Sequence, residues 1–285
     1  MSDVLQLSDP SMWTSVQPKP REETRAEVGA PERRPAAASI TEAVSSEDDV
    51  HPKEAAPTVS VTERLAHLHS AATPYLQYLM KLVHRVFLTT DRLGGAIRSV
   101  AFSAVDTRDD SALLSAAAAE LLASRVTGRV CLVDANFYAP SLHHCYGVSN
   151  DIGLIDALRS TGPVRSYARR LVQGHESSLW LLPAGSAEHR SELLLTSEQG
   201  QARIKDLLAG FDYVVISAPS VTQHPAVAAL GAEVDGIVMI AEADVTRRRA
   251  VRACADALRA SGGRVLGTVL NNRTFPIPEA VYRLL

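Results

Sequence analysis

Short apolar runs alternate with helical patterns from residue 98 to the end of the chain. Six runs rich in large apolar residues are predicted as strands: 99–105, 129–135, 178–184, 213–219, 236–242 and 264–271. The clearest helical segments between them are 110–125, 197–209, 225–232 and 246–260. Strands that are apolar on both faces and separated by helices are typical of a parallel sheet covered by helices on both sides. The sequence therefore predicts an α/β domain over residues 96–285.

A helical pattern precedes this domain. Apolar residues recur at helix-like spacings over 62–88, and Pro74 is predicted to divide the stretch into two helices. The second, 75–88, is apolar over much of its surface, so it either packs on the following domain or meets a partner. We favour packing. Residues 59–95 are therefore assigned to a helical linker that ends in the turn-forming pair Gly94–Gly95.

Residues 1–58 have a different composition. They are rich in Pro, Ala, Glu, Arg and Ser and contain few large apolar side chains. Such a segment buries too little apolar surface to offset the entropy lost on ordering, so we predict a disordered tail. The sequence of this tail contains no motif that identifies a binding partner.

Composition narrows the class of protein. A net charge of −3 gives no overall attraction to nucleic acid or to an anionic membrane. Three scattered cysteines fit a reduced compartment better than a disulfide framework. The N-terminus lacks the apolar region of a signal peptide, and 75–88 is too short and too polar to span a bilayer. We therefore expect a cytoplasmic protein with no direct membrane span and no nucleic-acid partner.

Sites in parallel sheets lie at the carboxyl ends of the strands. After the first predicted strand, a phosphate-binding loop would need glycines for the backbone, a Lys for charge and a Ser or Thr for magnesium. Residues 103–112 read SAVDTRDDSA, with neither Gly nor Lys. Taken alone, this segment is a loop with an N-capping Asp before a helix.

Three later stretches carry a family resemblance. They are LVDANFYAPSLHHCYGVSNDIGLIDAL (132–158), LLPAGSAEHRSELLLTSEQGQARIKDLLAGFDYVVISAPS (181–220) and ADVTRRRAVRACADALRASGGRVLGTVLNNRTFPIPEAVYRLL (243–285). Together, and in this order, they resemble the bacterial tyrosine kinases. The resemblance covers about 98–285 and implies a P-loop NTPase-like parallel sheet sandwiched by helices. It also implies kinship with cytoplasmic ATP-dependent kinases of capsule and exopolysaccharide export, and with the MinD and ParA ATPases.

The chain departs from this family at its phosphate loop. Where the family has GxGK[ST] opening the helix, the chain has TRDDSA (107–112), so Asp110 stands in place of the Lys and Ser111 alone remains as a magnesium ligand. Two unit charges about 4 Å apart interact by roughly 4 kcal/mol at an effective dielectric constant of about 20. Reversing the sign of that contact outweighs what one hydroxyl supplies.

Two further acidic positions are changed. Asp134 matches the first Asp of the family's D-x-D, which implies a role with magnesium and the acceptor hydroxyl. It fits a hydrogen-bonded structural carboxylate equally well. Asn136 replaces the second Asp, and Ser217 replaces the strand-end Asp of the third motif. Asn271 matches the family's adenine-contacting Asn, although a turn-capping role is slightly favoured.

We therefore predict a catalytically degenerate kinase-like protein that acts as a regulatory or interaction module in exopolysaccharide or capsule biosynthesis or export. Its expected partner is a membrane chain-length regulator or a kinase paralogue, which would recruit it to the inner membrane. The sequence is also compatible with a homo-oligomer. No cofactor is expected, but ATP and Mg²⁺ would be the ligands of any residual site at Ser111 and Asn271. Two alternatives are an active tyrosine autokinase or ATPase that uses Asp134, and a ParA/MinD-like positioning ATPase.

The remaining motifs carry less chemistry. The run His143–His144–Cys145 invites a metal site, but adjacent ligands diverge on a helix, so we do not expect one. Arg247, Arg248 and Arg249 begin a predicted helix in a region that is similarly basic in the family. We expect this helix start to be solvated or to face a partner.

Overall fold

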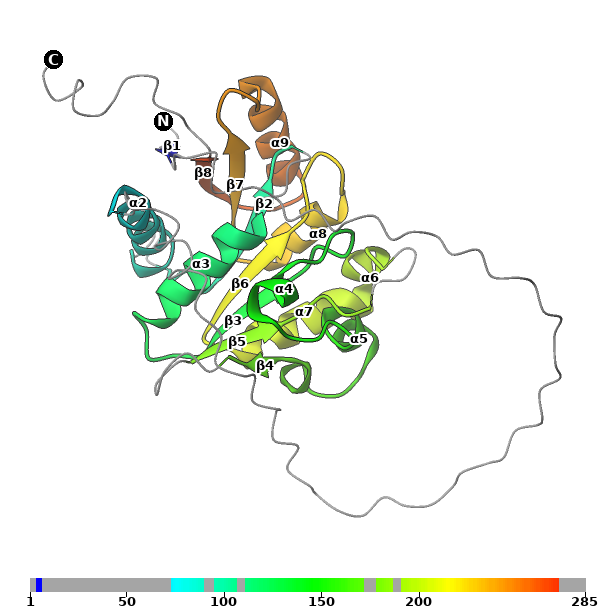
Figure 1. The fold of residues 1–285 in the computed structure, drawn as a ribbon. Helices are drawn as coiled ribbons and strands as arrows, with labels where there is room; N and C mark the ends of the chain where they lie inside the picture. Colours follow the sequence, from blue (N-terminus) through cyan, green and yellow to red (C-terminus); the bar gives the residue numbers. More distant parts are fainter. Residues whose placement is uncertain are drawn as a thin grey trace, which may run out of the picture. The chain divides into compact units, whose positions relative to one another are not determined.

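The structure, a computed structural model, describes residues 4–6, 73–89, 95–106, 111–171, 178–186 and 191–271. In this part of the chain one sheet has the strand order β1-β8-β7-β2-β6-β3-β5-β4 (Figure 1). The strands are β1 (Val4–Gln6), β2 (Ser99–Ala104), β3 (Val130–Asp134), β4 (Arg169–Arg170), β5 (Leu179–Leu182), β6 (Tyr213–Ala218), β7 (Gly236–Glu242) and β8 (Val265–Asn271). Neighbouring strands pair in parallel, except for the antiparallel pair β4–β5.

Helices cover both faces of the sheet, and a separate apolar core lies between the sheet and the helices on each face. The first core is formed with α2, α3 and α4, and the second with α5 to α9. Successive strand residues alternate between them: Leu132 belongs to the first core and Val133 to the second. The helices are α2 (Thr73–Val83), the π-helix η2 (His84–Leu88), α3 (Ser111–Ala123), α4 (Leu142–Tyr146), α5 (Leu154–Arg159), the 3-10 helix η3 (Val164–Tyr167), α6 (Leu193–Thr196), α7 (Glu198–Gly210), α8 (Ala226–Glu233) and α9 (Arg248–Ala260).

The six strands predicted from the apolar runs are all present, with ends shifted by at most a few residues. The short strands β1 and β4 were not predicted, because two or three residues are too few for a periodic pattern. The segment 7–72 and the C-terminal residues 272–285 lie outside the described residues. The domain boundaries at 58 and 95 therefore stay predictions.

Helix α2 packs on its own domain, as favoured from the sequence. Leu79, Leu82 and Val83 are buried in the core that contains α3. Pro74 is the second residue of this helix, a position where its missing N–H costs nothing. The expected helix upstream of Pro74 lies outside the described residues. No helix in the described part of the chain is long and apolar enough to cross a membrane.

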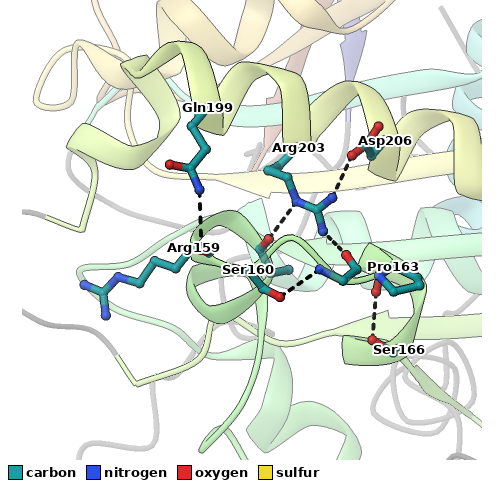
Figure 2. A network of polar contacts seen from close by, with 9 residues as sticks. Arg159, Ser160, Pro163, Ser166, Gln199, Arg203 and Asp206 are labelled. Carbon is teal, nitrogen blue, oxygen red and sulfur yellow. Dashed lines mark hydrogen bonds and ion pairs between the residues drawn. The ribbon is translucent and has the colours of Figure 1, made fainter.

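One arginine of α7 secures the connection that leaves α5 (Figure 2). The Arg203 Nε donates to the carbonyl of Ala157 (3.1 Å), and its Nη2 donates to the carbonyl of Gly162. Its Nη1 pairs with Asp206 at 2.7 Å. Because the last carbonyls of a helix lack helical partners, the guanidinium supplies hydrogen bonds that the end of α5 would otherwise take from water.

Candidate functional site

The parallel register gathers polar side chains at the carboxyl ends of the central strands. Asp134 ends β3 and pairs with Ser217 on β6, and Ser217 pairs in turn with Phe102 on β2. Ser111 begins α3, and its Oγ lies 3.2 Å from the Oγ of Ser217. Three residues that the sequence singled out, Ser111, Asp134 and Ser217, are thus on adjacent elements and buried.

The Ser111 hydroxyl takes part in hydrogen bonds inside the protein. Besides its contact with Ser217, it donates to the carbonyl of Ala218 at 3.2 Å. Both hydroxyls are fully buried. At this point the family resemblance places a magnesium ligand and an acidic residue, whereas here a pair of neutral hydroxyls joins the start of α3 to the end of β6. The two hydroxyls themselves carry no negative charge for a divalent cation.

Asp134 holds the backbone of the loop that follows its strand. Its Oδ1 accepts a hydrogen bond from the N–H of Asn136 (3.1 Å), and its Oδ2 accepts from the N–H groups of Ser141 and Leu142 (both 3.0 Å). The residue is only 1% exposed. Three backbone N–H bonds to one carboxylate at the start of α4 support a structural role, which is one of the two interpretations left open by the sequence.

Asn136 forms a turn in the same loop. Its Oδ1 accepts hydrogen bonds from the N–H groups of Tyr138 (3.3 Å) and Ala139 (3.1 Å). This contact with the backbone two and three residues later is the usual turn-forming use of an Asn side chain. Asp134 and Asn136, at the two acidic positions of the family's D-x-D, therefore both organise the loop between β3 and α4.

Asn271 lies further along the sheet. It ends β8, opposite Glu242 of β7, and β7 separates β8 from β2. The residue is buried, and its carbonyl accepts a hydrogen bond from the N–H of Ala243 at 2.8 Å. Asp110 belongs to the segment 107–110, outside the described residues, so the predicted charge reversal at the phosphate loop stays a prediction.

A cluster missed by the sequence analysis lies on the loops at this edge. The ring of Tyr138 stacks on His224, with centroids 3.8 Å apart, and His224 Nδ1 is 3.9 Å from Glu192 Oε2. Burial, a hydrogen bond to Glu192 and the charge of that carboxylate raise the pKa of Tyr138 to about 12. No sequence signal could have found the cluster, because its members come from three separate loops.

This cluster is unfavourable for phosphate binding. Tyr138 remains 52% exposed at this edge. The carboxylate beside it, Glu192, would repel a phosphate group, whereas a basic residue would attract one.

The metal interpretation of His143, His144 and Cys145 gains no support. Among the residues that the structure describes, no group of three or more His, Cys, Asp or Glu side chains is placed to hold a metal ion. The rings of His143 and His144 stack on each other at 3.8 Å. Burial, then the neighbouring His144, lowers the pKa of His143, so the neutral form of this imidazole is favoured.

No protein-family model matches the chain. The sequence is, however, similar to curated tyrosine-protein kinases. A putative tyrosine-protein kinase, CapB of Staphylococcus aureus, is 22% identical over 143 residues, which is 50% of this chain and 61% of the relative. The tyrosine-protein kinase YwqD of Bacillus subtilis (strain 168) is 24% identical over 146 residues, or 51% of this chain and 60% of the relative. The match thus spans about three fifths of the length of these relatives.

Solved structures share the fold. The chimerical protein CapA2B2 has a TM-score of 0.63 at 17% identity, covering 78% of this chain and 94% of that one. The kinase domain of the Escherichia coli tyrosine kinase ETK also has a TM-score of 0.63, at 16% identity, covering 80% and 85%. MinD in its complex with MinC from Aquifex aeolicus belongs to the same set, with a TM-score of 0.53 at 18% identity, covering 65% and 72%. The predicted P-loop NTPase-like fold is confirmed.

Proposed function

Because the chain is related to the bacterial tyrosine kinases, we propose that it is a kinase-like protein with a degenerate phosphate site. It acts as a regulatory or interaction module in exopolysaccharide or capsule biosynthesis or export. The observation that carries this proposal is the buried Ser111–Ser217 hydroxyl pair, which lies where a kinase of this family needs a magnesium ligand and an acid.

The electrostatics of the edge support the same proposal. Asp134 accepts hydrogen bonds from three backbone N–H groups, and Glu192 adds negative charge beside Tyr138. A nucleotide bound here would bring several more negative charges into this surrounding. The partner in this proposal is a membrane chain-length regulator or an active kinase paralogue, and that partner brings the cytoplasmic protein to the inner membrane.

Titration of the full chain with Mg-ATP tests the proposal. We expect calorimetry to show no binding tighter than high micromolar, because the sequence has Asp110 in place of the family's Lys and Ser217 in place of an acid. The B. subtilis relative, measured in the same buffer, is the control for the assay. Clear micromolar binding by this chain would overturn the proposal and favour a residual site at Ser111 and Asn271.

The autokinase alternative keeps one specific motivation, which is that Asp134 is retained. It requires phosphotyrosine on protein purified from a host without other tyrosine kinases. That signal would have to disappear in Asp134→Asn while the variant stays folded by circular dichroism. The ParA/MinD-like alternative has the shared fold alone in its favour.

A further inference from the structure

The turn between β7 and α9 is held in one conformation. Asp244 adopts φ 60°, the one positive φ among the described non-glycine residues. The carbonyl of Glu242 accepts hydrogen bonds from the N–H groups of Val245 (3.4 Å) and Thr246 (2.9 Å). In return, the Thr246 Oγ1 accepts from the N–H of Glu242 at 2.8 Å and donates to a carboxylate oxygen of Asp106.

This turn exposes a branched apolar side chain. Val245 is 50% exposed, although the residues on either side of the turn are fixed by hydrogen bonds. A rigid turn with an exposed apolar side chain is already in the conformation that a partner would contact, so docking would cost little conformational entropy.

Four arginines follow within the next seven residues. Arg247, Arg248, Arg249 and Arg252 are all exposed, and the first turn of α9 has no acidic residue. Within the part of the chain that the structure describes, the side chains of these four arginines form no ion pair or hydrogen bond. Cations at the N-terminus of a helix oppose its dipole, so this placement does not serve the stability of α9.

The composition of the surface selects the kind of partner. Its cations are arginines, whose planar guanidinium binds a carboxylate through two hydrogen bonds. Exposed acids flank them, Asp244 on one side and Asp256 on the other, and the chain as a whole carries a net charge of −3. A continuous polyanion such as DNA or an anionic membrane would meet these acids as well. A peptide can place its carboxylates on the arginines and an apolar side chain on Val245.

We propose that Val245 and the four arginines form a docking surface for an acidic segment of a protein partner, with one apolar residue of that segment seated on Val245. The surface lies outside the Ser111–Ser217 region, so its test and the Mg-ATP titration can fail independently of each other. It gives the proposed interaction module a defined place of contact.

Fluorescence anisotropy with the full chain tests the surface. The probe is a fluorescein-labelled peptide of glutamates around one leucine, and we expect saturable binding that weakens as NaCl is added. In Arg248→Glu/Arg252→Glu the dissociation constant should rise by at least about tenfold. Arg125→Glu, at an exposed arginine after α3, is the matched control and should bind like the parent chain.

The apolar contact needs its own measurement. Val245→Ser and a leucine-to-glycine probe should each weaken binding, and combining them should cost less than the sum, because both remove one contact. Three results would overturn the proposal. The first is equal peptide binding by Arg248→Glu/Arg252→Glu and Arg125→Glu, and the second is additive losses for Val245→Ser and the glycine probe. The third is tighter binding of the chain to phosphatidylglycerol vesicles or duplex DNA than to the peptide.

Discussion

Replacing Asp134 with alanine should lower the free energy of unfolding by about 3–6 kcal/mol, a large part of the stability of a typical domain. The variant would leave the buried N–H groups of Asn136, Ser141 and Leu142 without their acceptor. Hydrogen bonds to a charged group are each worth roughly 1.5–3 kcal/mol, and neighbouring losses do not add fully. Urea denaturation followed by circular dichroism measures the change.

Two variants sharpen this experiment. Asp134→Asn keeps one acceptor oxygen and should lose less than the alanine variant. Asp256→Ala removes an exposed carboxylate whose partner is the exposed Arg259, and it should change stability by no more than about 0.5 kcal/mol. An Asp134→Ala variant as stable as the parent would show that the three N–H groups do not depend on this carboxylate. That result would favour the catalytic interpretation of Asp134.

The second large effect is expected at Arg203 (Figure 2). Arg203→Ala should destabilise the protein by about 2–4 kcal/mol, because the carbonyls of Ala157 and Gly162 lose a charged donor. The side chain is only 11% exposed, so water replaces it poorly. Arg203→Lys should recover little, since an ammonium group cannot reach both carbonyls and Asp206 as a planar fork does.

Hydrogen exchange tells a local effect from a global one. We expect amides of α5 and η3 to exchange faster in Arg203→Ala, while those of β2 and β6 keep their order of protection. Arg259→Ala is the control, because the Arg259 side chain is 54% exposed and forms a surface pair within α9. Equal stability of the two alanine variants would contradict a clamping role for Arg203.

Much of the architecture could be predicted from the sequence because the central strands are buried on both faces. Runs such as 129–135 and 213–219 have few polar interruptions, and their carboxyl ends place Asp134 and Ser217 on neighbouring strands. The loops were less predictable, since their structure depends on contacts between side chains and distant backbone groups. The two carbonyl acceptors of the Arg203 guanidinium, those of Ala157 and Gly162, lie more than forty residues away in the chain, and no local pattern encodes them.

The candidate site was likewise predictable in its residue types but not in its loop contacts. Residue types alone indicated that charges were missing at Asn136 and Ser217, and the geometry then gave both residues other partners. The stacking of Tyr138 on His224 could not be foreseen, because the two residues follow different strands. The two interpretations of Asp134 could be weighed only when its three N–H donors were located.

The antiparallel strand β4 has a consequence for self-association. It is two arginines long, and it forms the outermost position on its side of the sheet. Short edge strands that carry positive charge are poor templates for the strands of another molecule, which protects against aggregation. Fibre growth through this border is therefore disfavoured, and a protein that binds on this side is expected to recognise side chains instead of extending the hydrogen-bond ladder.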